Sequence, residues 1–328
     1  MKKDKNAALI ILNYLLVYII WGSTYFFIKI AVSTIPPFHV IGLRFFGGGL
    51  FFLLIALISG RLKKLPTIKE TLTSMLLGGL LLLGGTGLVT TAEKKVDSYL
   101  AALIISTTPV AVAFFDRILL KKRLSIISIT GIVIGISGVG LLLYNGHSLA
   151  KSFSLEVILI IIGLTSWSFA TSLGHVMKTP SDSIVNSCIQ ILSVGILCML
   201  ILLFTKPSVQ TLFPTFSMES LYSVAMLSFI GSLGFLAYTF LIHNEPAIRV
   251  VSYAFVNPMI AVILGLIIGK EKPVPFLIPG IVLILTGLFQ MLYGDMFFRK
   301  LKKFVALQRF KNFKVRIEDS TKCQQRQK

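Results

Sequence analysis

Long runs of apolar residues, separated by short clusters of charge, proline or glycine, follow one another along most of the chain. Many of them approach the roughly 20 residues that an α-helix needs to cross a bilayer. The alternating runs of about ten residues that are typical of a membrane β-barrel are absent from the sequence. The pattern predicts an all-α polytopic membrane protein with ten transmembrane helices, at about 8–31, 38–59, 71–92, 97–119, 125–144, 154–177, 183–205, 219–242, 247–268 and 275–295.

Composition favours the same fold class. Of the 328 residues, 55% are hydrophobic and only 14% are charged, and the mean hydropathy is +0.86. Soluble domains are about one quarter charged, because charged side chains cover much of their surface. The N-terminal apolar run begins like a signal peptide, but it is longer and lacks a small-residue cleavage site at its end. We therefore expect an uncleaved first helix.

The net charge of +19 would suggest a nucleic-acid partner in a soluble protein, but here membrane topology explains it. Lys and Arg gather on the cytoplasmic side of membrane proteins. With the N-terminus inside, the inner segments hold twelve Lys and Arg before the tail, and the outer connections hold six. We therefore predict a multi-pass protein of the cell (inner) membrane, with both termini cytoplasmic and no nucleic-acid partner.

The segment 297–328 forms a basic cytoplasmic tail in this topology. It mixes Phe, Leu and Val with Lys and Arg at near-helical spacing. Basic residues close to anionic lipid contribute about 1 kcal/mol each. We expect anionic lipids to contact the tail, and either an amphipathic helix on the membrane surface or a solvated disordered chain fits its composition.

The two halves of the chain resemble each other. A shift of 146 residues places Trp21 on Trp167, and a shift of 149 places Pro109 on Pro258. Five helices in each half give the halves opposite orientations, because five is odd. We predict a 5+5 inverted-topology repeat, with five-helix units at 1–146 and 147–296. Such repeats are typical of alternating-access carriers, which bind their substrate near the membrane midplane, where the repeats meet.

Pro109 and Pro258 lie about eleven residues into their predicted helices. A proline inside a helix leaves the carbonyl four residues earlier without its amide partner, and in lipid that carbonyl needs another polar partner. Thr108 and Asn257 stand next to the two prolines. We predict helix kinks at both prolines, acting as a hinge or as part of a binding site.

Two cations, Lys29 and Arg44, lie inside or at the end of apolar runs. Lys29 is near the outer end of the first helix, where its side chain can reach the interface. Arg44 lies roughly 9 Å deep at 1.5 Å per residue, where an unpaired cation costs at least about 2.5 kcal/mol. Glu93 ends the third helix on the same side. We hypothesise that Glu93 pairs with Arg44 or Lys29, with simple interfacial anchoring as the alternative for Lys29.

Several stretches resemble a known family. The run WGSTYFFIKIAVSTIPPFHVIGLRF resembles the opening signature of EamA-domain proteins in the drug/metabolite transporter superfamily. The runs GLVTTAEKKVDSYLAALIISTTPV, SWSFATS, and SYAFVNPMIAVILG followed by GKEK are similar to its YedA-type inner-membrane permeases. The resemblance covers about residues 8–295. It implies ten helices in a 5+5 inverted repeat around a central cavity, and export of amino acids, related metabolites or drugs.

Candidate residues of the substrate pathway come from the positions of residues within the predicted helices and from the resemblance to EamA-domain proteins. Aromatic residues inside the helices are expected to form cavity walls for a small organic solute, and the resemblance adds residues by motif position. The combined set is Trp21, Thr24, Tyr25, Arg44, Glu93, Thr108, Trp167, Gln190, Tyr238, Tyr253 and Asn257. Lys122 departs from the family pattern, because members often end the fourth helix with Gly-Glu, and only Glu271 keeps that motif in the second half.

We predict a secondary transporter that exports small metabolites (amino acids, related compounds or drugs) by alternating access. Coupling to a proton or a counter-solute would need a titratable group, for which Glu93 comes first, followed by Asp97, Asp116 and His175. Uptake, exchange or uncoupled flux, and a non-transporting scaffold or sensor, stay open as alternatives. Walker, HExxH and serine-nucleophile motifs are absent from the sequence, and the three cysteines lack metal-ligand spacing. We therefore expect no enzyme, no cofactor and no metal.

Overall fold

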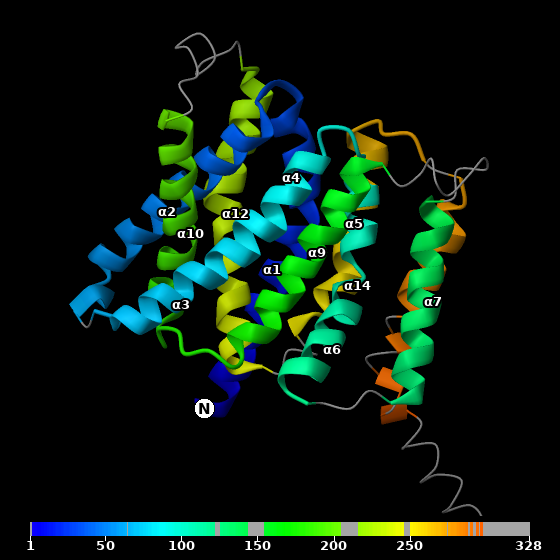
Figure 1. The fold of residues 1–328 in the computed structure, drawn as a ribbon, viewed down its shortest axis with the longest axis horizontal. Helices are drawn as coiled ribbons and strands as arrows, with labels where there is room; N and C mark the ends of the chain where they lie inside the picture. The colour runs from blue at the N-terminus through cyan, green and yellow to red at the C-terminus, as the bar shows by residue number, and fades with distance from the viewer. Residues whose placement is uncertain are drawn as a thin grey trace, which may run out of the picture.

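The computed structural model describes residues 2–63, 65–121, 125–143, 154–204, 216–245, 250–273, 275–287, 289–290, 293–294 and 296–297, and all regular elements within them are helical (Figure 1). Seven helical stretches are long and apolar enough to cross a membrane: Ala8–Thr34, Pro37–Ile58, Ile68–Ala92, Ser98–Leu119, Leu155–Gly174, Ser183–Phe204 and Met218–Asn244. Three shorter apolar stretches are Ile126–Gly138, Val256–Ile268 and Leu277–Gly287. The predicted all-α polytopic membrane fold is confirmed, and the count of ten crossings stays a prediction.

The elements follow the predicted apolar runs closely. They are α1 (Lys2–Thr34), α2 (Pro37–Ile58), η1 (Arg61–Lys63), α3 (Ile68–Gly78), η2 (Gly79–Gly87), α4 (Leu88–Ala92), α5 (Ser98–Ile105), α6 (Thr108–Leu119), α7 (Ile126–Leu143), α9 (Leu155–Gly174), α10 (Ser183–Phe204), α12 (Met218–Asn244), α14 (Tyr253–Ile263) and η3 (Leu264–Ile268). Lys122 and residues 298–328 lie outside the described residues, so the predictions for Lys122 and the basic tail stay predictions.

Helix starts have local causes in the sequence. Pro37 lies in the first turn of α2, where its missing amide proton is not needed. Thr67 and Glu70 form a capping box at the start of α3, and the hydroxyl of Ser217 accepts a hydrogen bond from the amide of Ser220 at the start of α12. The π-helical segment η2 joins α3 to α4, so residues 68–92 form one continuous crossing.

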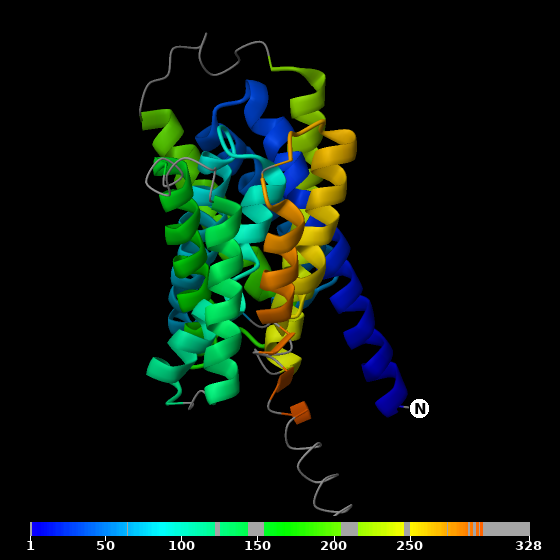
Figure 2. The ribbon, with the colours of Figure 1, turned by 90° about the vertical axis from the view of Figure 1, so that its right-hand side faces the viewer.

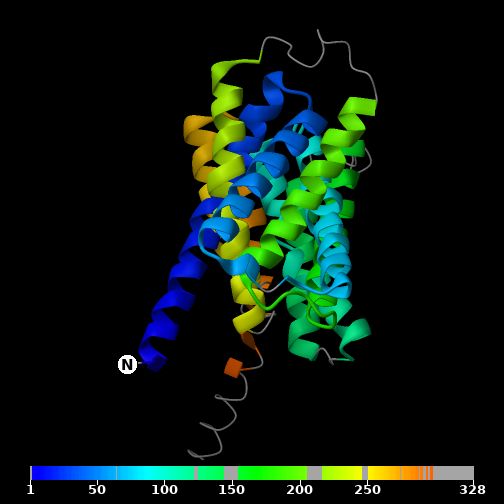
Figure 3. The same cartoon turned by 90° about the vertical axis from the view of Figure 1, so that its left-hand side faces the viewer.

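Helices from the two halves of the chain pack against each other. The most extensive contacts join α2 to α10 and α1 to α12, and α9 packs along η2. The first turns of α1 project from the bundle in both side views (Figures 2 and 3). The core is therefore shared between the halves and does not consist of two separate five-helix cores.

Glycine allows α2 and α10 to approach closely. A Cβ atom at Gly195 would overlap the backbone of Phe46, and one at Gly49 would lie 2.6 Å from the Cα atom of Leu192. Small residues are common at such crossings, because association in lipid depends on close van der Waals packing. Gly195 lies in this interface, and the sequence pattern did not predict its role there.

Two positions related by the 149-residue shift share an unusual backbone conformation with a positive φ angle. Lys121 has a φ of 53° and Lys270 a φ of 52°. Such values are uncommon for residues other than glycine. The helices before them, α6 and η3, end at Leu119 and Ile268, which the same shift also relates. Matching helix ends and matching backbone conformations support the predicted repeat.

The two prolines behave differently. α5 ends at Ile105 and α6 begins at Thr108, so at Pro109 the chain breaks into two helices, where the sequence predicted a kink. The freed carbonyl of Ile105 accepts a hydrogen bond from the Thr108 hydroxyl at 2.5 Å. Pro258 lies inside α14, which continues past it. At Pro109 the freed carbonyl therefore has a neighbouring hydroxyl as its polar partner.

Substituting Gly195 with alanine should destabilise the protein by about 1–3 kcal/mol, because the added methyl group forces α2 and α10 apart. Thermal unfolding of the purified protein in detergent measures this effect. Gly79→Ala is the matched control, since nothing lies within 4 Å of its added Cβ. Equal unfolding temperatures for the two variants would contradict the tight crossing.

Candidate functional site

A central cavity lies where helices of both halves meet. Its unfilled space is about 740 Å³, including the part open to solvent, which is within the roughly 300–1,000 Å³ typical of small-molecule sites. The lining residues are Trp21, Thr24, Tyr25, Ile28, Arg44, Phe45, Leu82, Gly85, Thr86, Val89, Ile105, Thr108, Gly163, Trp167, Ile191, Gly231, Ser232, Phe235 and Tyr253. Most of them are apolar or aromatic, and Arg44 is the charged member of the set.

The structure separates the predicted pathway residues into three groups. Seven line the central cavity, namely Trp21, Thr24, Tyr25, Arg44, Thr108, Trp167 and Tyr253. Gln190 and Tyr238 line a second, smaller pocket. Glu93 and Asn257 are buried and line neither. With its amide oriented to satisfy both acceptors, Asn257 donates hydrogen bonds to the carbonyls of Tyr253 and Tyr18.

Aromatic rings pack together in the wall of the central cavity. The ring of Trp21 lies 5.3 Å from that of Trp167, 5.0 Å from Tyr238 and 5.2 Å from Tyr253, between centroids. The edge-to-face and tilted geometries are those that aromatic pairs prefer. Trp21 and Trp167, which the internal repeat relates, therefore meet in space. We call Trp21, Trp167, Tyr238 and Tyr253 the aromatic cluster.

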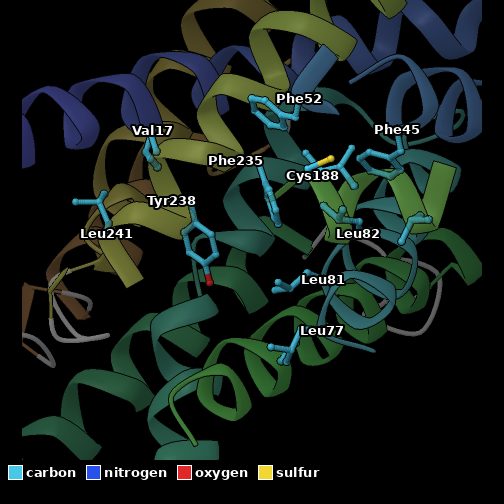
Figure 4. Close-up of a cluster of buried hydrophobic side chains, with 14 of the residues drawn as sticks. Val17, Phe45, Phe52, Leu77, Leu81, Leu82, Cys188, Phe235, Tyr238 and Leu241 are labelled. Carbon is cyan, nitrogen blue, oxygen red and sulfur yellow. The ribbon is translucent and has the colours of Figure 1, made fainter. Parts of the chain in front are cut away.

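The second pocket adjoins the aromatic cluster. Phe235 lines the central cavity and Tyr238 lines the second pocket, and Figure 4 shows their rings side by side. The Tyr238 hydroxyl is 2.7 Å from that of Thr171. Polar residues Asn186, Thr239 and His243 also line this pocket. The Tyr238 ring thus lines the second pocket and packs against Trp21 and Trp167, which line the central cavity.

Arg44 lies in the wall of the central cavity, and within the described part of the chain no carboxylate forms an ion pair with it, although Glu93 interacts with it over a longer distance. Arg44 is buried, with an exposed fraction of 8%. Its guanidinium carbon lies 5.2 Å from the centroid of the adjacent Phe45 ring. Its Nη1 atom has no hydrogen-bond partner among the described residues. A Cβ on Gly231 would lie 3.5 Å from Nη2, so the glycine leaves room beside the cation.

The predicted pair of Glu93 with Arg44 or Lys29 does not form as a direct contact, and both cations act on the Glu93 carboxylate only over a longer distance. Glu93 is fully buried, and neither of its oxygens has a hydrogen-bond partner within the part of the chain that the structure describes. Lys29 donates instead to the carbonyl of Val96 at 2.7 Å and lies 3.9 Å from Asp97. The turn after α4 places these acceptors closer to Lys29 than the Glu93 carboxylate.

Glu271 joins the two halves at the end of the bundle that carries Glu93. Its carboxylate accepts hydrogen bonds from the amide and hydroxyl of Ser98, at 3.1 and 2.7 Å. The Tyr99 hydroxyl donates to the carbonyl of Lys272 at 2.8 Å.

Burial and the nearby Glu271 raise the pKa of Asp97, and Lys29 only partly offsets this. Sequence reasoning noted Glu271 as a family motif but missed its partner Ser98.

Glycines of the cavity wall were also missed as site residues. Gly85, Gly163 and Gly231 line the cavity. The sequence analysis had no signal to separate a glycine that packs helices from one that opens space for a solute. Within the described residues, no group of three or more His, Cys, Asp or Glu side chains has the arrangement of a metal site.

Comparison with known proteins decides the family. The model of the EamA-like transporter family matches residues 8–144 and 154–293. The chain belongs to the EamA-like transporter family. It is a transporter-family membrane protein, and the resemblance noted in its sequence is confirmed.

Individual relatives agree with this assignment. The chain is 36% identical over 257 residues to Escherichia coli K12 "Uncharacterized inner membrane transporter YedA", covering 77% of this chain and 81% of the relative. It is 28% identical over 278 residues to Bacillus subtilis "Uncharacterized transporter YvbV", covering 82% and 87%. A solved structure named "Crystal structure of protein" superposes with a TM-score of 0.61 over 86% of this chain and 96% of its own, at 19% identity. That last likeness concerns the fold.

Glu271→Ala should lower the free energy of unfolding by about 1–3 kcal/mol, because it leaves the buried amide and hydroxyl of Ser98 without their acceptor. The matched control is Glu219→Ala, which removes an exposed carboxylate from the first turn of α12. Thermal unfolding in detergent compares the two. A Glu271 variant as stable as the control would show that the link between the halves contributes little.

Proposed function

We propose that the protein is a secondary transporter that exports small metabolites by alternating access through the central cavity. The observation that carries the proposal is the cavity itself, which is built by helices of both halves and bounded on one side by the aromatic cluster. Inverted repeats of this kind expose a site near the midplane to each side of the membrane in turn. Amino acids, related compounds and drugs are the solute classes that the family resemblance suggests.

The central cavity and the second pocket together support alternating access. Both carry predicted pathway residues, and rings of the aromatic cluster line both. A solute passing between them requires Trp21, Trp167 and Tyr238 to move apart. Movement of α1 against α12, which packs along it, would open this route.

We propose the cell (inner) membrane as the location, with both termini cytoplasmic and the basic tail against anionic lipids. The relative YedA is named an inner membrane transporter, and the excess of Lys and Arg in the predicted inner connections sets the orientation. The relatives are named transporters, and we propose no catalytic role. Uptake or exchange uses the same cavity, and the direction of solute movement distinguishes them from export.

For coupling, we propose that Glu93 exchanges a proton during the cycle. A buried carboxylate without hydrogen-bond donors is costly when ionised. A conformational change that admits water would lower that cost. Glu93 precedes Asp97, Asp116 and His175 as the candidate, because neither of its oxygens has a partner among the described residues.

Metabolite profiling of cells and medium, with and without the protein, tests the proposed function. Thr86→Trp should abolish solute movement, because Thr86 lines the cavity and an indole there fills it. Thr91→Trp is the matched control on the same crossing, since Thr91 is exposed and lines neither space. We expect at least one solute to accumulate in the medium with the unmodified protein and with Thr91→Trp, and not with Thr86→Trp.

Two results would contradict the proposal when the variants reach the membrane at equal levels. No solute difference between cells with and without the protein would remove the transport function. Equal solute movement with Thr86→Trp would show that solutes do not pass through the central cavity. Accumulation inside the cells, abolished by Thr86→Trp, would replace export with uptake.

A further inference from the structure

Two buried hydrogen-bond donors in the wall of the central cavity are poorly satisfied. Nη1 of Arg44 has no hydrogen-bond partner among the described residues, and the indole Nε1 of Trp167 has only the nearby Tyr253 hydroxyl, outside strict hydrogen-bonding geometry. Buried polar atoms are normally paired, and an unpaired one costs the full desolvation of the group. The unpaired groups of this cavity are donors, so a ligand that satisfies them must bring acceptors.

The charge of the cavity wall has one sign. Its nineteen lining residues include Arg44 and no Asp, Glu or Lys. Glu93 is nearby but does not line the cavity. A cation in a largely apolar wall attracts an anion strongly, because little water competes for it. The planar guanidinium also matches the geometry of a carboxylate.

The remaining wall suits an apolar body with few polar groups. Trp21, Trp167, Tyr253 and Phe235 offer ring faces and edges. The hydroxyls of Thr24 and Thr108 already donate to the carbonyls of Trp21 and Ile105. These hydroxyls therefore do not need a ligand to satisfy their protons.

We propose that the central cavity selects small organic anions, holding a carboxylate on Arg44 and an aromatic or aliphatic body against Trp21 and Trp167. The proposal rests on the proposed transport function and narrows its solute class. The cavity wall has no carboxylate to bind an ammonium group, so zwitterionic amino acids and cationic drugs fit it less well than monocarboxylates do.

The two tryptophans of the chain, Trp21 and Trp167, both line the cavity, so intrinsic fluorescence reports binding there directly. The purified protein is titrated in detergent with phenylacetate, its neutral amide phenylacetamide, zwitterionic phenylalanine and cationic phenethylamine. All four share one ring and differ chiefly in charge. We expect phenylacetate to bind at least about tenfold more tightly than each of the others, as a charge-assisted hydrogen bond implies.

Arg44→Gln should reduce this preference to about equal binding of phenylacetate and phenylacetamide, and Arg44→Lys should retain part of it. Lys29→Gln is the matched control. It removes a cation from α1, next to the α2 helix that carries Arg44, and Lys29 does not line the cavity. That variant should keep the full preference. If Arg44→Gln does not fold, the four ligands on the unmodified protein decide the question by themselves.

The anion assignment is overturned if phenylacetamide or phenylalanine binds as tightly as phenylacetate, if phenylacetate gives no fluorescence change, or if Arg44→Gln keeps the preference. These outcomes are independent of flux. A protein that prefers phenylacetate but moves no solute in cells loses the proposed transport function and keeps the anion site. A protein that moves solutes yet binds the amide equally well keeps transport and loses the anion site.

Discussion

Hydrocarbon offers no hydrogen bonds, and the placement of polar groups in this protein follows from that constraint. The polar side chains of the crossings turn toward the interior of the bundle or bond to their own helix backbone. Thr108 satisfies the carbonyl that Pro109 frees, and Ser98 meets Glu271 across the two halves. Among the buried groups of the described residues that lack a partner, Arg44 lies in the wall of the central cavity. The constraint therefore identifies the site as well as the fold.

Close helix packing determines where that cavity lies. Glycine brings α2 and α10 together at Gly195 and Gly49, so these helices leave no space for a solute at their crossing. Around Arg44, by contrast, Gly231 leaves room beside the guanidinium. Rings of the aromatic cluster form part of the wall of this cavity. Glycine thus has two roles in this protein: it allows helices to pack closely at one place and leaves space for a solute at another.

The sequence predicts the helical architecture well, because burial in lipid demands long apolar runs. The predicted range 183–205 is α10 at Ser183–Phe204 in the structure. Trp21 and Trp167, which the 146-residue shift relates, have their rings in contact. Partners of single side chains were harder to predict. Lys29 donates a hydrogen bond to Val96 and forms an ion pair with Asp97, because the turn after α4 brings both residues near it. Helical spacing in the sequence does not predict that turn.

Irregular backbone limited the prediction of the site in a similar way. The π-helical segment η2 changes which residues share a helix face, so ideal periodicity does not tell that Gly85 and Thr86 line the cavity. Gln190 and Tyr238 were predicted for the pathway, but they line the second pocket, and the Tyr238 ring packs against Trp21 and Trp167 of the central cavity. Only the packing of the rings in three dimensions shows this division.

The central claim is that two halves of opposite orientation enclose the cavity, and the sidedness of Lys121 and Lys270 tests it most directly. Both are exposed and related by the repeat. Each is replaced by cysteine in a chain whose three native cysteines are serine, and labelled in intact cells and in inverted vesicles with a membrane-impermeant maleimide. We predict labelling of position 270 only from outside and of position 121 only from inside. Labelling of both positions from the same side would contradict the inverted arrangement.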